Sequence, residues 1–281
     1  MKLRVVELLL ISTIPAMALA ERGLPPLGIT VATLLGGTLA AGSANAFNQV
    51  IEKDLDELMQ RTKRRPLVEK QVTSIESLIF ATLIGILALS IFWIFTTPLA
   101  TFLTFFAIAY YVIVYTILLK RRTSQNIVWG GAAGCMPVLI GWAAITNSIT
   151  LSGLLFFLVI FFWTPPHFWA LAIKYKDDYQ RAKIPMLPVV ASQKIVASAM
   201  LWHSLAMVVA SIALGFSAKL PLAYLIIATV LGLGFIYLVI GVRETATINL
   251  EKVEKSAARV FHGSITYLSL LSLALTLFAL I

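Results

Sequence analysis

Asn48, Glu52 and Asp56 are the first residues in the sequence whose types and spacing suggest chemistry. They follow one another at intervals of four in the stretch NQVIEKDLDELMQRTKRRPL. If the preceding helix continues through them, this spacing places all three on one face, while Asp54 and Glu57 point elsewhere. Two carboxylates and an amide are hard oxygen ligands that suit Mg²⁺, whose shell is completed by water and phosphate oxygens. The alternative is a solvated helix end whose acids pair with nearby lysines and arginines.

A second polar stretch, KYKDDYQRAKIPMLPVV, begins at Lys174 and places Asp178 four residues further on. The number of apolar runs between the two stretches puts both on the same side of a membrane. Acids that hold Mg²⁺ beside bases that hold phosphate describe a diphosphate site, and an apolar bundle beneath it suits a prenyl tail. The cations in excess around the acids are Arg61, Lys63, Arg64, Arg65, Lys120, Arg121 and Lys174.

The composition places these residues in an integral membrane protein. Of 281 residues, 59% are hydrophobic and only 12% are charged, and the mean hydropathy is +0.92, outside the range of soluble domains. A helix needs roughly 20 apolar residues to cross ~30 Å of hydrocarbon. We therefore predict an all-α, polytopic protein with nine spans in a single domain covering residues 1–281. The nine runs are 5–21, 28–50, 74–95, 98–119, 126–146, 150–173, 195–217, 220–241 and 260–280.

The basic residues predict the orientation of these spans. With the N-terminus in the cytoplasm, 20 of the 22 Lys and Arg residues fall in cytoplasmic segments, and only Arg22 and Lys219 fall outside. The first run has the charge pattern of a signal peptide, but Glu7 within it favours a retained helix. We expect a multi-pass protein of the cell membrane with its site toward the cytoplasm. The net charge of +9 then meets membrane lipid headgroups or an anionic substrate, and we expect no nucleic-acid partner.

Several stretches resemble the UbiA-type intramembrane prenyltransferases, most closely the branch of that family that acts on haem. They are LRVVELLL, NQVIEKDLDELMQRTKRRPL, YTILLKRRTSQNIVWGGAAG, IGWAAITNS and WTPPHFWALAIKYKDDYQRAKIPMLPVV, so the resemblance covers nearly the whole chain. It implies a bundle of nine helices with acid-rich motifs on the second and sixth helices. The segments WTPPHFWALA and IPMLPVV are the most specific.

The resemblance also assigns roles to individual residues. It places the first acid motif on Asn48, Glu52 and Asp56. In the second motif Lys174 stands where the wider family has Asp, while Asp178 is kept. Glu52 likewise replaces a commoner Asp, and both departures leave the number of Mg²⁺ ions open. The expected metal ligands are Asn48, Glu52, Asp56 and Asp178, and the expected diphosphate contacts are Arg61, Arg65, Lys120, Arg121, Asn126 and Lys174.

The reaction that the resemblance implies is the transfer of a farnesyl group from farnesyl diphosphate to a vinyl group of haem B, which gives haem O. Mg²⁺ is the implied cofactor, and haem B is a substrate rather than a resident group. Haem A synthase and the assembly of a terminal oxidase are the implied partners. The single Cys135 allows neither an internal disulfide nor a thiolate metal cluster.

His167 is the candidate residue for contact with haem. It follows Pro165 and Pro166, which we expect to kink or weaken the sixth long helix, and it shares a helix face with Lys174 and Asp178. At ~1.5 Å per residue it lies roughly 10 Å deeper than Lys174. The alternative is a neutral histidine bonded to a backbone carbonyl that the prolines have freed. For two further histidines, His203 and His262, we expect packing or interface roles.

Two other functions compete with this interpretation. Another UbiA-type enzyme would join a prenyl group to an aromatic or glycerophosphate acceptor, but we expect such an enzyme to keep an acid at position 174. A transporter would use the acids as an ion pathway, yet transporters place ionisable groups at mid-membrane. Here the acids gather at helix ends, which favours an enzyme.

Overall fold

The computed structural model describes residues 3–246 and 249–281, in which helices are joined by loops and no strand occurs. The first half contains α1 (Leu3–Glu21), α2 (Leu27–Ile51), α3 (Lys53–Leu58), α4 (Ser74–Phe95), α5 (Pro98–Ala109), the π-helix η1 (Tyr110–Leu119) and α6 (Asn126–Gly130). The second half contains α7 (Ala132–Thr146), α8 (Leu151–Lys174), α9 (Lys176–Arg181), α10 (Leu187–Val190), α11 (Gln193–Ser217), α12 (Leu222–Thr245) and α13 (Leu250–Ala279).

Eight helical segments in the described part of the chain are long and apolar enough to cross a membrane. Six of them are single helices, and two are composite, because η1 continues α5 and α7 continues α6. The prediction of a polytopic all-α protein is therefore confirmed. The remaining predicted run, 5–21, coincides with α1, a helix of 19 residues that is not among those eight segments.

The bundle exposes apolar side chains outward and packs small residues inward, as expected of helices in lipid. Trp93 on α4 and Val230 on α12 are 67% and 63% exposed. Between α2 and α4, Ser43 donates a hydrogen bond to the Ala81 carbonyl, and a Cβ on Gly85 would lie 2.7 Å from Ser43 Oγ. Only glycine therefore fits this close helix crossing without movement of its neighbours.

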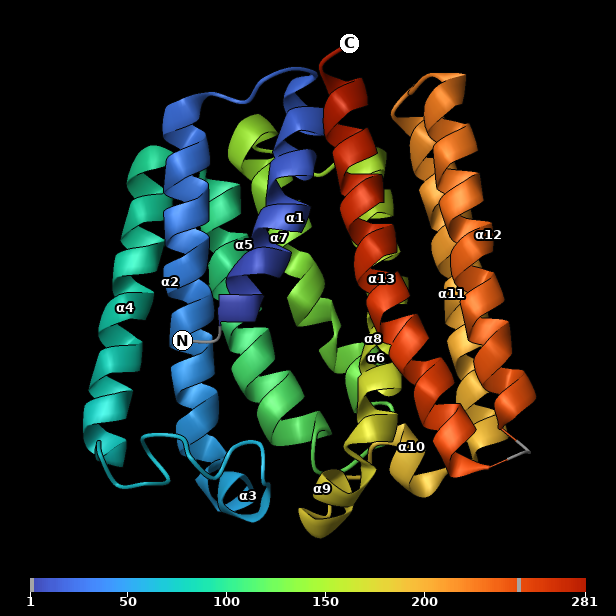
Figure 1. Ribbon diagram of the computed structural model, residues 1–281. Coiled ribbons are helices and arrows are strands. Elements are labelled where there is room, and N and C mark those ends of the chain that lie inside the picture. Colours follow the sequence, from blue (N-terminus) through green and yellow to red (C-terminus); the bar gives the residue numbers. More distant parts are fainter. Residues whose placement is uncertain (1–2, 247–248) are drawn as a thin grey trace.

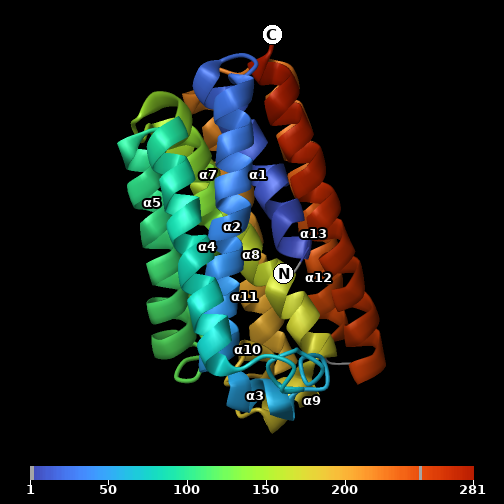
Figure 2. The same cartoon turned by 90° about the vertical axis from the view of Figure 1, so that its left-hand side faces the viewer.

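The helices form one bundle in which α2 and α4 lie on one flank and α11 and α12 lie on the opposite flank (Figure 1). Between the flanks, α1 contacts α7 and α13, while α8 packs against α7, α11 and α13. The short helices α3, α9 and α10 lie together at the end of the bundle away from the C-terminus, and the view turned by 90° places them at that same end (Figure 2). This end therefore gathers both acid-rich stretches.

Candidate functional site

The acid-rich stretch at the end of α2 forms a buried polar face. The helix does not continue unbroken through this stretch, because α2 ends at Ile51 and Glu52 leaves helical geometry before α3 begins. Backbone hydrogen bonds nevertheless join Glu52 N–H to the Asn48 carbonyl and Asp56 N–H to the Glu52 carbonyl, each at 2.9 Å. The three side chains consequently keep one face, with exposed fractions of 2% for Asn48, 1% for Glu52 and 3% for Asp56.

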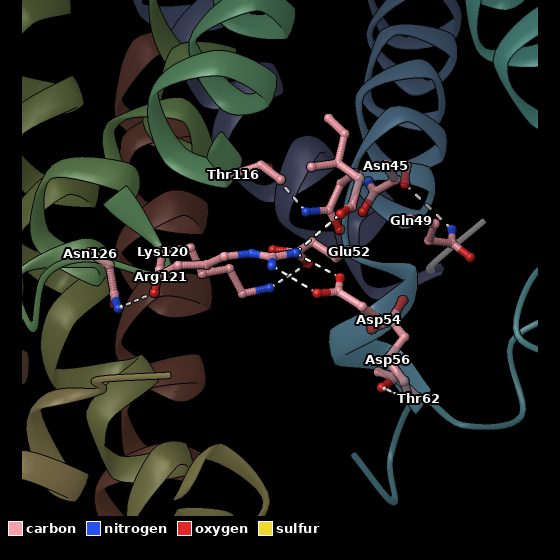
Figure 3. A network of polar contacts seen from close by, with 12 residues as sticks. Asn45, Gln49, Glu52, Asp54, Asp56, Thr62, Thr116, Lys120, Arg121 and Asn126 are labelled. Atoms are coloured by element: carbon pink, nitrogen blue, oxygen red, sulfur yellow. Dashed lines mark hydrogen bonds and ion pairs between the residues drawn. The ribbon is translucent and has the colours of Figure 1, made fainter. Parts of the chain in front are cut away.

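A cation is bonded to each of the two buried carboxylates. Lys120 Nζ lies 2.5 Å from Glu52 Oε2 (Figure 3), and Arg65 donates to Asp56 Oδ2. Only one oxygen of Glu52 is used, because Oε1 is buried and has no hydrogen-bond partner among the residues that the structure describes. The two acids are therefore buried, and not solvated as the alternative interpretation had expected. They do form ion pairs with nearby basic residues, as that interpretation also expected.

Arg121 makes a separate, more exposed pair at the same kink. Its guanidinium binds both oxygens of Asp54 at 2.7 and 2.8 Å and also donates to the Ile51 carbonyl, the last of α2 (Figure 3). The hydrogen bonds from Arg121 lower the pKa of Asp54 below its ordinary value, and the same contact raises the pKa of Arg121. This pair fixes the turn between α2 and α3.

Asn126, at the start of α6, lies beside this network. Its Nδ2 donates to the Lys120 carbonyl at 3.3 Å (Figure 3). The residue is fully buried, and its Oδ1 has no hydrogen-bond partner in residues 3–246 and 249–281. Glu52 and Asn126, which both bond to Lys120, thus each keep a buried oxygen without a partner among the described residues, and such oxygens are sites for a water, an ion or a ligand.

The Tyr175 ring, in the second acid-rich stretch, lies next to a cation of the first stretch. Lys174 ends α8 and its Nζ lies 5.7 Å from the centre of the Tyr175 ring, while the Arg61 guanidinium lies 6.0 Å from the same ring. Two of the five cations expected to contact diphosphate therefore converge on Tyr175, a residue that the sequence reasoning missed. Its only signal was its place beside the second motif, and its partner Arg61 lies far away in sequence.

One of the four expected metal ligands, Asp178, makes no direct contact with the other three in the described residues. Asp178 is 6% exposed and pairs with Arg181 of its own helix, and in the described residues no bond joins it to Glu52 or Asp56. Nor do three or more His, Cys, Asp or Glu side chains gather into a metal-binding group anywhere in the described residues. The face of one amide and two carboxylates by itself fits Mg²⁺, which takes few carboxylates and completes its shell with water and phosphate.

His167 lies in an aromatic cluster between α8 and α13. Its ring stacks on Trp163 at 4.3 Å and on Phe261 at 4.7 Å between ring centres. Its Nδ1 lies 2.7 Å from Ser264 Oγ, and Ser264 donates its single hydroxyl proton to the Phe261 carbonyl. Nδ1 must therefore carry the proton and donate it to Ser264, which leaves a lone pair on Nε2.

The alternative interpretation of His167 is wrong in its partner, because the bond goes to a serine hydroxyl rather than to a freed carbonyl. Pro165 and Pro166 do not end the helix, since α8 runs from Leu151 to Lys174. The other two histidines place Nδ1 2.8 Å from a carbonyl of their own helix, His203 from that of Ala199 and His262 from that of Ala258.

Comparison with known proteins identifies the family of this chain. The model of the UbiA prenyltransferase family matches residues 9–265, and the chain belongs to this family of intramembrane prenyltransferases. A relative from Frankia casuarinae named protoheme IX farnesyltransferase is 50% identical over 100% of this chain and 96% of its own.

Two solved structures share the fold at low sequence identity. A structure described in work on digeranylgeranylglyceryl phosphate synthase has a TM-score of 0.79 and 16% identity, and covers 99% of this chain and 95% of its own. A UbiA homologue from Archaeoglobus fulgidus bound to DMAPP and Mg²⁺ has a TM-score of 0.68 and 14% identity, with 95% and 97% covered. The expected family and membrane class are thus confirmed.

Proposed function

We propose that this protein transfers the farnesyl group of farnesyl diphosphate to a vinyl group of haem B and so makes haem O. The C1–O bond of farnesyl diphosphate breaks, and its electron pair leaves with the diphosphate. The vinyl π electrons form the new bond to C1, and water captures the resulting cation and loses a proton. The product carries a hydroxyethylfarnesyl group, and diphosphate is released.

The observation that carries this proposal is the buried face of Asn48, Glu52 and Asp56 at one end of an apolar bundle, with Lys120 and Arg65 bonded to it. A prenyl diphosphate needs this combination of groups, because its anion must be held at the rim while its tail lies among apolar side chains. The names of the relatives support haem as the acceptor.

Asn48, Glu52 and Asp56 are the proposed ligands of Mg²⁺, with Asp178 as a further ligand from the second motif. The bound cation supplies charge that stabilises the departing diphosphate. The UbiA homologue bound to DMAPP and Mg²⁺ supports this assignment. Lys120 and Arg65 neutralise the acids in the present structure, and in the loaded site they are free to turn to the diphosphate.

The proposed diphosphate contacts differ in how they are held. Asn126 is buried and donates a hydrogen bond to the carbonyl of the half-buried Lys120, while Arg61 and Lys174 share the Tyr175 ring at the rim. Lys174 takes the place of the acid that the wider family has in the second motif, so it binds the anion directly there. The complete set is Arg61, Arg65, Lys120, Arg121, Asn126 and Lys174.

His167 is the proposed contact for haem. Its ring is clamped between Trp163 and Phe261, and its Nε2 keeps a lone pair. A neutral imidazole whose other nitrogen is fixed by a hydrogen bond is the usual form of a histidine ligand to iron. Nε2 is therefore the atom of His167 that can bind the haem iron.

The proposed topology has nine spans, with α1 as the first and the acid-rich end toward the cytoplasm. At ~1.5 Å per residue, 19 residues of α1 reach nearly across ~30 Å of hydrocarbon. The two basic residues assigned to the opposite side, Arg22 and Lys219, line one recess together with Phe278 near the C-terminus. The excess of basic residues at the other end follows the positive-inside rule for the cell membrane.

Purified protein incubated with haem B, farnesyl diphosphate and Mg²⁺ tests the proposal when the extracted haem is analysed by mass spectrometry. We expect a product with farnesyl and hydroxyl increments. Asp56→Asn should lose this product, whereas Asp177→Asn, which changes an exposed acid, should keep it. Unaltered haem together with prenylation of an aromatic or glycerophosphate acceptor would replace this function with that of another UbiA-type enzyme.

A further inference from the structure

We infer that Thr116 is a positioning residue that turns the amide of Asn48 so that its Oδ1 faces the divalent cation. Thr116 lies in η1, outside both acid-rich motifs, and neither its type nor its sequence neighbours mark it as functional. The inference rests on the metal site proposed above and adds to it the residue that orients the only ligand without a charge.

The hydrogen bonds fix the direction of the amide. Thr116 Oγ1 lies 2.9 Å from the Tyr111 carbonyl, and a carbonyl cannot donate, so Thr116 must give its single hydroxyl proton to it. Toward Asn48, at 3.0 Å, the same oxygen can then only accept. The group of Asn48 that faces Thr116 is therefore its NH₂, and this holds whichever way the amide is drawn.

The opposite end of the amide is left for a ligand. Asn48 Oδ1 makes no hydrogen bond within the described part of the chain, although the residue is only 2% exposed. Glu52, four residues further along the same face, also keeps one oxygen without a partner among the described residues. Two free oxygens on one buried face form the start of a hard cation shell.

The π-helix is what makes the Thr116 bond possible. In an α-helix a threonine hydroxyl returns to the carbonyl three or four residues earlier, as Thr104 does to Ala100 in the neighbouring α5. Thr116 instead reaches back five residues to Tyr111, which follows the i→i+5 pattern of η1. π-helical turns are rare and often occur at functional sites, and a segment of ten residues is long for this geometry.

Two contacts one turn apart join η1 and the residue after it to the face that carries Asn48 and Glu52. Asn48 meets Thr116, and Glu52 meets Lys120 with the same sequence separation of 68 residues. The Lys120 N–H also bonds the carbonyl five residues earlier, that of Tyr115. The π register thus sets the depth and direction of both groups that η1 presents to the metal-binding face.

Replacing Thr116 by Val removes the hydroxyl at nearly constant volume. The residue is fully buried, so the NH₂ of Asn48 loses its partner and the amide is free to turn. Loss of a group that orients a metal ligand weakens metal binding about 10–100-fold. Thr116→Ser keeps the hydroxyl and should restore binding. Thr104→Val is the matched control, because Thr104 is a buried threonine of the same span that bonds only its own helix.

The test uses Mn²⁺ as the probe, titrated by electron paramagnetic resonance in the presence of a non-hydrolysable farnesyl diphosphate analogue. We expect the dissociation constant of Mn²⁺ to rise at least tenfold in Thr116→Val and to stay near the wild-type value in Thr116→Ser and Thr104→Val. If Thr116→Val is not recovered folded, Thr116→Ala is compared with Thr116→Ser in the same way. An equal dissociation constant in wild type and Thr116→Val overturns the inference and leaves the proposed function standing.

A double-mutant cycle separates positioning from general packing. If Thr116 acts through Asn48, then Thr116→Val has no further effect on Mn²⁺ affinity in the Asn48→Ala background. An equal loss in both backgrounds assigns Thr116 a packing role and overturns the inference. Wild-type protein that binds no Mn²⁺ beside the analogue overturns both the inference and the proposed metal site.

Discussion

Replacing Lys120 by Met should destabilise the protein and make its stability depend on Mg²⁺. The side chain of Glu52 is 1% exposed and that of Lys120 is 17% exposed, so the change leaves a buried carboxylate without its counterion. Breaking a buried pair in this way costs about 3–5 kcal/mol. Because Lys120 keeps some contact with solvent, we expect the lower end of that range, about 3 kcal/mol.

The melting temperature of the detergent-purified protein, followed by tryptophan fluorescence, measures this loss. For a chain of this size about 3 kcal/mol corresponds to a decrease in Tm of roughly 5–10 °C. A cation bound by Glu52 replaces the missing charge, and Mg²⁺ at about 100 times its Kd returns about 2.7 kcal/mol. Lys120→Met should therefore regain most of its Tm with Mg²⁺, whereas the wild type should gain less.

Two further variants test whether the decrease in Tm comes from the buried pair of Glu52 and Lys120. Lys255→Met removes a cation that pairs with Glu251 at 2.6 Å, but both side chains are at least 70% exposed, so its Tm should stay close to that of the wild type. Lys120→Met combined with Glu52→Gln removes both charges and should recover Tm without Mg²⁺. If Lys120→Met melts like the wild type, or gains nothing from Mg²⁺, the buried pair is not the cation site that we describe.

Three further predictions concern other parts of the site. Because Arg121 holds the pKa of Asp54 below its ordinary value of 3.8, the pair stabilises the fold at neutral pH, and the Tm difference between wild type and Asp54→Asn should vanish as the pH falls below that value. His167→Ala should abolish the shift in haem absorption that accompanies binding, and an unchanged spectrum would exclude ligation. Gly130→Ala places a Cβ 2.1 Å from the Tyr115 ring and should lower kcat on the order of 10-fold or more, while Gly134→Ala, with open space around it, should not.

The sequence predicted the class of fold and the buried face because both depend on short-range patterns. Apolar runs of span length identify membrane helices, and a spacing of four identifies one helix face. The kink at Glu52 did not change this outcome, because the backbone bonds on either side of it keep the four-residue period.

The π-helix could not be predicted from its sequence. YYVIVYTILL is apolar on every side, so it contains no polar period that would distinguish i→i+5 from i→i+4 bonding. The hydrogen-bond partners of the candidate residues could not be predicted from the sequence for a different reason. Ser264 lies 97 residues from His167, and Thr116 lies 68 residues from Asn48, so only the packing of helices reveals that these pairs meet.

The central claim is that the site at the acid-rich end joins a farnesyl group to haem and that water completes the product. Incubating the purified protein with haem B, farnesyl diphosphate and Mg²⁺ in water enriched in the heavy oxygen isotope tests this claim most directly. We predict a haem whose mass has increased by a farnesyl group and a hydroxyl that contains the heavy isotope. Haem recovered unchanged, or farnesylated with ordinary oxygen, would contradict the account.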